Sequence, residues 1–305
     1  MKDGKRYNNL SGELKKILGE KTGKLSIDGG FTCPNRDGHL GDKGCLFCGE
    51  RGAGEFTIGT LEIAEQIKSQ MNIARKKWNV NKFITYFQSF TNTYAPIEKL
   101  KELYEKSLDQ EGVVGLAIAT RPDCLSLEVL DYLEELNKRT FLWVELGLQT
   151  IHPESHRLLR TGYGLKTYED AISELKKRGI KVVTHLILGL PGETFDQMIE
   201  SVKYVASTST WGIKLHSLYI QRDTDLYTMY LEEPFSIMTL DEYVSLIGKA
   251  LAILPEDMVI HRLTGDGYKS LLFLPEWGKN KLSVISAIDK YLKENDIWQG
   301  QNFKL

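Results

Sequence analysis

The stretch KVVTHLILGLPGET, residues 181–194, decides the fold of this chain. It begins with an apolar run of strand length and continues into Gly-Leu-Pro-Gly, which is a turn signal. Thr194, with Gln197 three residues later, then has the pattern of a helix N-terminus. The stretch therefore predicts one strand–turn–helix unit of the kind that builds parallel sheets.

The same unit repeats along most of the chain. Short β-rich runs alternate with amphipathic helical patterns from about Lys24 to about Leu218. The six expected strands are 24–28, 83–88, 113–119, 141–148, 181–188 and 212–218. Six units are too many for a small two-layer fold and too few for a closed eight-unit barrel. We therefore expect an open, partial (β/α)6 barrel with its chemistry at the carboxyl ends of the strands.

Helix signals between the strands agree with this pattern. Residues 60–78 are expected to form a helix. Its apolar stripe, which should pack against the sheet, consists of Ala64, Ile67, Met71, Ala74 and Trp78. Thr167 with Asp170 resembles a capping box, and Gly179 is placed to end that helix. Thr239 with Glu242 repeats the N-terminal signal further along the chain.

The last part of the chain has a mixed pattern. Helices are expected near 239–254 and 282–295, with a short strand at 258–263 and a loop rich in Gly, Pro and Trp. We interpret residues 1–218 as the barrel, with a cluster loop at 30–54. Residues 219–305 are interpreted as a C-terminal extension that covers the mouth or side of the barrel and is not independent of it.

Composition sets the broad class of the protein. In 305 residues, 39 Lys+Arg against 41 Asp+Glu leave a formal charge of −2, which excludes a basic protein that coats polyanions without selectivity. The first twelve residues contain no apolar signal region, and no apolar run approaches the roughly 18 residues that span a bilayer. We expect a cytoplasmic protein with no membrane partner.

Three of the four cysteines lie in the run CPNRDGHLGDKGCLFC, residues 33–48, directly after the first expected strand. Such a glycine-rich loop suits a compact inorganic centre, but three thiolates are one ligand short of a closed zinc site or a fully ligated iron–sulfur cube. Two interpretations stay open. His39 completes a Cys3His structural zinc site, or one iron is left open for a substrate or cofactor. The single Cys-x2-Cys pair and the position at a barrel mouth favour the open site.

These features together resemble the radical SAM superfamily. Four further blocks follow the ends of successive expected strands, YFQSFTNTY (86–94), ATRPDC (119–124), ELGLQT (145–150) and HLILGLPGET (185–194). Over almost the whole chain they resemble the Elp3-like branch and, within it, the YtqA/YhcC-type, MnmL-like subgroup. The long spacing from Cys33 to Cys45 is similar to that of the Elp3-like and coproporphyrinogen-oxidase-like branches. The implied fold is α/β, a partial (β/α)6 radical SAM barrel with a mixed C-terminal extension.

The resemblance implies two cofactors, a [4Fe–4S] cluster and S-adenosylmethionine (SAM). Cys33, Cys45 and Cys48 would bind the cluster, and its open iron would chelate the amino and carboxylate groups of SAM. Reduction would then cleave SAM to methionine and a 5′-deoxyadenosyl radical, which takes hydrogen from an unactivated carbon. The implied partner is a one-electron donor such as flavodoxin or ferredoxin.

Several positions match residues that bind SAM in this family. Phe47, next to the third cysteine, is expected beside the adenine. The family's Gly-Gly-Glu motif is absent, so Gln88 is the candidate for the amino group, with a turn-stabilising role as its alternative. Glu145 and Gln149 lie four residues apart and are expected on one side of a strand. The resemblance assigns them to the amino group or the ribose hydroxyls.

For each residue further along the chain, the role in binding SAM has a structural alternative. Arg160 matches the residue that pairs with the methionine carboxylate, or it is a solvated surface arginine. Gly189 and Leu190 belong to a turn that faces adenine, or to an ordinary βα turn. His185 and His216 lie in apolar strands, where they either face the barrel interior or are satisfied core residues.

The block after the third strand supplies candidates for substrate contact. Arg121 and Asp123 are expected to make polar contacts there. Cys124 follows Arg121-Pro122-Asp123, and the proline indicates that the chain has already left the sheet. Its thiol either returns a hydrogen atom to a substrate radical or is a small buried residue.

Elp3-like kinship implies that the substrate is the wobble uridine of tRNA, remodelled at its 5-substituent from carboxymethylaminomethyl toward aminomethyl. Candidate RNA contacts, or else solvated faces and extension core, are the basic groups at 75–77 with Lys82, at 176–178 and at Lys279/Lys281, and the aromatic residues Tyr219, Tyr227, Tyr268 and Trp277. One alternative is a radical SAM enzyme acting on a small-molecule or porphyrin-like substrate. The other is a zinc-stabilised RNA- or protein-binding module.

Overall fold

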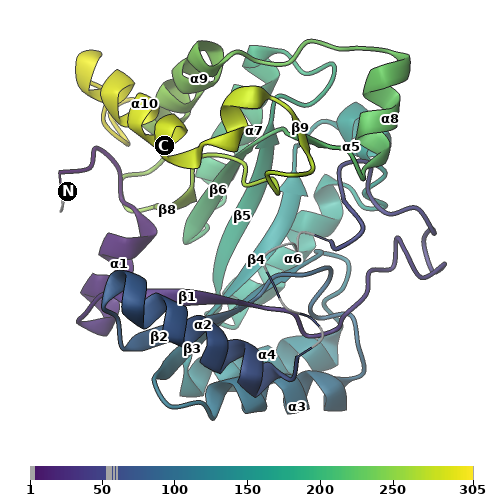
Figure 1. Ribbon diagram of the computed structural model, residues 1–305, viewed down its shortest axis with the longest axis vertical. Helices are drawn as coiled ribbons and strands as arrows, with labels where there is room; N and C mark the ends of the chain where they lie inside the picture. Colours follow the sequence, from purple (N-terminus) through teal and green to yellow (C-terminus); the bar gives the residue numbers. More distant parts are fainter. Residues whose placement is uncertain (1–3, 53–56, 58, 60, 305) are drawn as a thin grey trace.

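The computed structural model describes residues 4–52, 57, 59 and 61–304. In that part of the chain, a parallel sheet of seven strands follows the spatial order β1-β2-β3-β4-β5-β6-β8. Its strands are β1 (Thr22–Ile27), β2 (Lys82–Phe87), β3 (Val113–Thr120), β4 (Phe141–Gln149), β5 (Lys181–Leu188), β6 (Gly212–Ser217) and β8 (Val259–Arg262). The sheet curls into an open half-barrel, as expected from the sequence (Figure 1).

Most of the helices cover the outer face of the sheet or flank the half-barrel (Figure 1). They are α1 (Leu10–Leu18), α2 (Ile63–Trp78), α3 (Ile97–Leu108), α4 (Leu127–Arg139), α5 (Pro153–Leu159), α6 (Leu165–Lys177), α7 (Phe195–Ser207), α8 (Asp225–Glu232), α9 (Leu240–Ile253) and α10 (Lys281–Glu294). A second, antiparallel sheet pairs β7 (Ile220–Gln221) with β9 (Leu272–Leu274), followed by the 3-10 helix η1 (Glu276–Lys279).

The seventh strand differs from the expected six-unit barrel. The short strand expected at 258–263 is β8, and it pairs in parallel with β6. Residues 219–305 thus extend the sheet itself. Helix α1 packs against both β1 and β8, and Ile260 donates its backbone N–H to the carbonyl oxygen of Asn8 at 2.7 Å. The N-terminal segment therefore joins the two edges of the open barrel.

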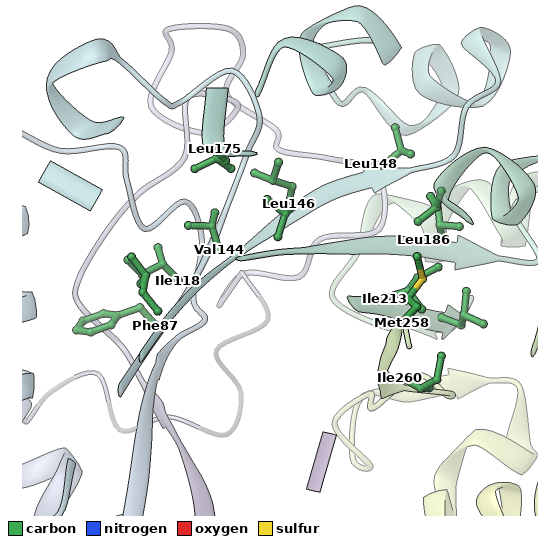
Figure 2. Close-up of a cluster of buried hydrophobic side chains, with 14 of the residues drawn as sticks. Phe87, Ile118, Val144, Leu146, Leu148, Leu175, Leu186, Ile213, Met258 and Ile260 are labelled. Carbon is green, nitrogen blue, oxygen red and sulfur yellow. The ribbon is translucent and has the colours of Figure 1, made fainter. Parts of the chain in front are cut away.

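Strand alternation divides the side chains between two environments. On β4, Val144, Leu146 and Leu148 pack into the layer between sheet and helices, together with Leu175 of α6 (Figure 2). Trp143, in contrast, packs inside the half-barrel with residues of β2 and β5 and with Leu14 of α1. Each fully buried apolar side chain stabilises the fold by about 1.5–3 kcal/mol. The outer layer therefore holds the helices, while the inner positions remain available for chemistry.

Two expected local features are wrong. The residues buried on α2 are Ile63, Gln66, Ile67, Met71 and Ala74, whereas Ala64 and Trp78 are exposed. The start expected at Thr60 lies outside the described residues. Thr167 does not cap a helix, because α6 begins at Leu165, which packs on the core, with Gly164 as N-cap. The capping boxes of Thr194 with Gln197 and of Thr239 with Glu242 are confirmed.

Candidate functional site

A cavity of about 330 Å³ opens inside the half-barrel at the carboxyl ends of the strands. Side chains from the cysteine loop, from β1 to β6, from β8 and from the segments after them line it. Those used below are Cys33, Cys45, Phe47, Cys48, Tyr86, Gln88, Arg121, Glu145, Gln149, Tyr163, His185, Lys214, His216, Tyr219, Arg262 and Asp266. The cavity thus joins the cysteine loop to charged side chains of the barrel interior.

The cysteine loop is held by two of its own side chains, which donate hydrogen bonds to backbone carbonyl oxygens. Asn35 donates its side-chain amide to the carbonyl oxygens of Arg160 (2.8 Å) and Thr161 (3.2 Å) beyond α5. Arg36 donates to the carbonyl oxygens of Cys48 and Gly49, both at 2.7 Å. These bonds use the supporting side chains and leave the three half-buried thiols facing the cavity.

Gly44 is a position where the loop requires glycine. Its φ is 76°, in the left-handed region, and a Cβ there would lie 2.9 Å from Nε of Arg36. A larger residue would therefore displace the guanidinium that holds the end of the loop.

Burial raises the pKa of the Cys48 thiol to about 12 and also raises the pKa of Cys45. Both thiols are therefore protonated at neutral pH when no cation is bound. A metal centre that takes them as thiolates has to displace these protons.

His39 lies apart from the cysteines that it was considered to join. It lines a second cavity with Pro34, Tyr94 and Cys124, and its side chain is exposed. Among the residues described, no three His, Cys, Asp or Glu side chains are grouped to hold a single metal ion. The structure therefore gives the Cys3His zinc interpretation no histidine ligand at this loop.

At the other end of the cavity, the Glu145 carboxylate is the centre of a polar network. It accepts hydrogen bonds from the Tyr86 hydroxyl (2.6 Å), the Trp143 indole (2.9 Å) and His185 Nε2 (2.9 Å). The Lys214 ammonium donates to the same carboxylate and to the Tyr86 hydroxyl. Glu145 is 1% exposed, so a carboxylate there is tolerated only because these donors surround it.

The electrostatics of this network follow from burial and charge. Burial alone would raise the pKa of Glu145, but Lys214, Lys24 and His185 outweigh it and hold the pKa well below its ordinary value. Burial lowers the pKa of Lys214, and Glu145 opposes that shift. Burial, with Lys214, lowers the pKa of His185 to about 4. His185 is therefore neutral at pH 7, and it donates Nε2–H to an ionised Glu145.

The residues predicted to bind the cofactor divide into two groups. Phe47, Gln88, Glu145, Gln149 and His185 all line the cavity. The regular alternation of β4 breaks at Gln149, which has φ 69° and follows a register shift against β5, yet its side chain still lines the cavity with Glu145.

The other three residues do not line the cavity. Arg160 ends α5 and forms an ion pair with Asp225 of α8 at 2.6 Å. Gly189 and Leu190 turn away, since Leu190 is buried against an apolar cluster that includes Leu46. The carboxylate contact of Arg160 and the adenine contact of this turn therefore stay predictions that the lining of the cavity does not test.

The candidates after β3 also separate. Arg121 lines the cavity, 4.9 Å over the ring of Tyr163, and makes a two-point contact with Asp123 at 2.9 and 2.7 Å. Asp123 and Cys124 line the second cavity instead. Burial raises the pKa of the Cys124 thiol to about 12. Asp123 therefore affects the first cavity only by holding Arg121 in place, whereas Cys124 lines the second cavity.

Sequence patterns missed Tyr86, Tyr163, Lys214 and Arg262 as site residues. Lys214 carried a usable signal, because it is a charged residue within an apolar strand and its alternation partner His216 had been noted. Arg262 reaches the cavity only because β8 joins the sheet beside β6.

Two of the basic groups proposed for RNA lie away from the cavity, whereas Lys281 pairs with Asp266 beside it. Residues 75–77 and 176–178 end α2 and α6, and helices of βα units run back toward the amino ends of the strands. Those ends are opposite the cavity. Arg178 is also paired with Glu174 and Asp131. Trp277 stacks on Tyr243 in the extension core, so Tyr219 is the aromatic candidate at the cavity itself.

None of the described helices is both long enough and apolar enough to cross a membrane.

Comparisons with known proteins add the family context. The radical SAM superfamily model matches residues 33–205, and the model of the radical SAM C-terminal domain matches residues 210–294. The chain is 43% identical over 301 residues to the uncharacterized protein YtqA of Bacillus subtilis, covering 98% of this chain and 94% of YtqA. It is 28% identical over 182 residues to a tRNA uridine(34) acetyltransferase of Methanocaldococcus infernus, covering 56% of this chain and 34% of that protein.

Among solved structures, the fold is similar to that of Methanocaldococcus infernus Elp3 lacking residues 1–46. The TM-score is 0.72 at 18% sequence identity. The match covers 91% of this chain and 64% of the Elp3 chain, so this chain spans less than two thirds of that protein. At this identity the likeness concerns the fold alone.

Proposed function

The chain belongs to the radical SAM superfamily, and we propose that it remodels the 5-substituent of tRNA wobble uridine, from carboxymethylaminomethyl toward aminomethyl. Enzymes of this family use a [4Fe–4S] cluster and SAM and require an external reductant. The observation that carries the proposal is a single cavity with three thiols at one end and a charged polar network at the other. The first end suits the cofactors, and the second suits a polar substrate.

The donor set of the loop fits the cluster. Cys33, Cys45 and Cys48 supply three thiols to one cavity, and Asn35 donates to the sulfur of Cys45 at 3.3 Å. Three cysteines leave one iron of a cube without a protein ligand, as a cofactor that binds through that iron requires. When bound, the cluster and SAM supply the electron and the hydrogen-abstracting radical of this family's chemistry.

The remaining lining residues surround the space next to the thiols. Phe47 supplies an apolar face, while Gln88 and Gln149 supply amides that can both donate and accept. Arg121 is held rigidly by Asp123 and Tyr163. The network around Glu145 forms the inner wall, and Tyr219 closes one side. A wall of this kind limits the entry of water and holds a bound substrate in one orientation.

Two observations support a nucleobase as the substrate. The cavity has a volume of only about 330 Å³ and is shared with the cofactors, so a folded RNA has to stay outside and only a group as small as a base can enter. The similarity to a tRNA uridine(34) acetyltransferase supports the same nucleoside class. Enzymes that act on a base commonly take it out of its stack and bind it beside aromatic residues, a role that Tyr219 can fill.

The test compares nucleosides of bulk tRNA from cells with and without the gene. Cells without the gene should accumulate the carboxymethylaminomethyl nucleoside at the expense of aminomethyl derivatives. Complementation with the wild-type gene should reverse this change, and complementation with Cys45→Ala should not. Identical nucleoside profiles in the two strains would contradict the proposed function.

A further inference from the structure

The inner end of the cavity contains more cationic than anionic side chains. Those facing it or lying directly beside it are the cations Lys24, Lys214, Arg262 and Lys281 and the carboxylates Glu145 and Asp266. Both carboxylates are already engaged, Glu145 by Lys214 and Asp266 by Lys281 at 2.8 Å. Among the described residues, two carboxylates thus face four cations, and Asp266 is shared between Lys281 and Arg262.

Arg262 is the cation with the most unused binding capacity. Its guanidinium lines the cavity, and its ion pair with Asp266 is long, at 3.5 Å. Lys214, on the neighbouring strand, is paired with Arg262 in the sheet register, so the two side chains start from the same level of the barrel. A guanidinium presents a planar set of donors that matches the two oxygens of a carboxylate.

His216 provides a second, independent indication of a ligand. It lies two residues after Lys214 on β6 and lines the same cavity. Its Nε2 is enclosed and has no hydrogen-bond partner among the residues that the structure describes. Enclosed polar atoms are nearly always paired. A ligand in the cavity would supply the missing partner once the ring of His216 turned its Nε2 toward it.

We propose that Arg262, Lys214 and His216 form a subsite for a carboxylate carried by the substrate. This inference rests on the proposed function and identifies the part of the substrate that enters deepest, namely the acidic end of the 5-substituent. A carboxylate at this position would balance the cationic excess and meet the planar donors of Arg262. Substrates without a negative charge at this end would leave the cations uncompensated and bind more weakly.

The subsite is separate from the end that holds the cofactors. Arg262 ends β8, whereas the cysteine loop follows β1 and is tied to residues 160 and 161 after α5. In Figure 1 the purple loop after β1 lies on the right, and β8 lies on the left. The carboxylate of SAM, which belongs to the cluster end, is therefore not the anion that this subsite would bind.

The first test measures binding of two anticodon stem-loop RNAs to the cluster-loaded protein in the presence of SAM and without reductant. One RNA carries 5-carboxymethylaminomethyluridine at the wobble position, and the other carries its methyl ester. Wild-type protein should bind the acid about tenfold more tightly than the ester, as expected for one charge-assisted contact. Arg262→Gln should reduce the ratio to near one and leave ester binding within about twofold. Lys290→Gln removes an exposed lysine of α10 that pairs with Glu294, and it should keep the wild-type ratio.

A second measurement does not depend on RNA or on chemistry. Sodium acetate, compared with sodium chloride at equal ionic strength, should raise the melting temperature of wild-type protein and of Lys290→Gln but not of Arg262→Gln. Arg262→Lys keeps the charge without the planar donors, so acetate should raise its melting temperature by an intermediate amount. This variant also serves as a control if the glutamine variant does not fold.

The outcomes separate the two proposals. Equal binding of acid and ester by wild-type protein, without stabilisation by acetate, would overturn the carboxylate subsite while leaving a wobble-uridine substrate intact. Stabilisation by acetate, with neither RNA bound more tightly than an unmodified stem-loop, would support the subsite and contradict the proposed tRNA substrate. An acid preference that survives Arg262→Gln would also overturn the assignment of this subsite.

Discussion

The two ends of the cavity are built in opposite ways. At the cysteine end, supporting side chains bond mainly to backbone, as Asn35 and Arg36 do, and the Cys45 thiol accepts a weak hydrogen bond from Asn35. At the inner end, side chains bond to one another, and Glu145 alone is contacted by Tyr86, Trp143, His185 and Lys214. The first arrangement fixes where reactive groups lie without using them, whereas the second consumes most of its polar groups.

This difference indicates which residues can act on ligands. At the cysteine end, nearly every functional side chain is available, so substitutions there should remove function and spare the fold. At the inner end, Glu145 is mainly structural in the absence of ligand, and Arg262 and His216 are the groups left for recognition. The assignment of Glu145 to SAM rests on the family resemblance and stays a prediction.

The largest effect is expected from the thiols. Replacing Cys33, Cys45 or Cys48 singly by alanine should abolish the iron-dependent absorbance near 400 nm, the bound iron and cleavage of SAM, because the loop offers only three thiolates and each variant leaves two. The matched control, His39→Ala, changes an exposed residue of the same loop and should retain all three signals. Loss of the metal centre in that control would support instead the Cys3His zinc site, in which His39 is a ligand.

Removing the carboxylate at the inner end should destabilise the fold. Glu145→Ala leaves Lys214 buried without its counter-ion, so the free energy of unfolding should fall by about 3–5 kcal/mol in urea denaturation. Glu276→Ala, at an exposed ion pair with Lys279, should change it by less than about 1 kcal/mol. A fully stable Glu145→Ala protein would show that the network does not hold the barrel together.

The difference in unfolding free energy between wild type and Glu145→Ala should depend on pH in one direction. The pKa of Glu145 is depressed in the folded state, so its contribution is complete above the unfolded value, about 4.3, and is lost as pH falls through the folded value. The stability gap between wild type and Glu145→Ala should therefore shrink as pH falls below about 4, where protonation of this carboxylate begins to favour the unfolded state. A gap that did not shrink below about pH 4 would contradict an ionised Glu145.

A smaller effect is expected from the support of the cysteine loop. Arg36→Ala removes the donors to the carbonyl oxygens of Cys48 and Gly49, and groups that orient ligands commonly contribute tenfold or more to metal affinity. Release of iron to a chelator should be about tenfold faster than in wild type. Lys43→Ala, at an exposed position of the same loop, should release iron at the wild-type rate. Equal rates in both variants would show that the backbone bonds are dispensable.

The smallest effect is expected at Cys124, which lines the second cavity. Cys124→Ala, with its iron content verified, should form 5′-deoxyadenosine and product within about twofold of the wild-type rates. Continued formation of 5′-deoxyadenosine with product lost would place the thiol in the chemistry after all.

The strands and the family were predictable because their signals are local. The run at 181–188 coincides with β5, and the other expected strands end within a residue or two of the observed ones. The radical SAM resemblance, carried by short motifs at strand ends, is confirmed. A seventh strand in the same sheet was not predicted, since parallel pairing of β8 with β6 is a long-range contact.

The site was predictable only where a residue type by itself indicates chemistry. Three cysteines clustered in a glycine-rich loop can be recognised from the sequence as ligands of an inorganic centre. Strand-end residues such as Gln88 and Gln149 do line the cavity. The ion pair of Arg160 with Asp225 of α8 was not visible in the sequence, because it joins segments far apart in the chain; the assignment of Arg160 to the methionine carboxylate stays a prediction. Lys214 was overlooked because its importance comes from Glu145, a residue on a different strand.

The most direct test of the proposed activity is an anaerobic reaction of the reconstituted protein, SAM and a reductant with tRNA from cells that lack the gene. The prediction is that the carboxymethylaminomethyl nucleoside is lost, the aminomethyl nucleoside appears, and 5′-deoxyadenosine accumulates alongside. Cleavage of SAM by a fully iron-loaded protein with the tRNA nucleosides unchanged would contradict it.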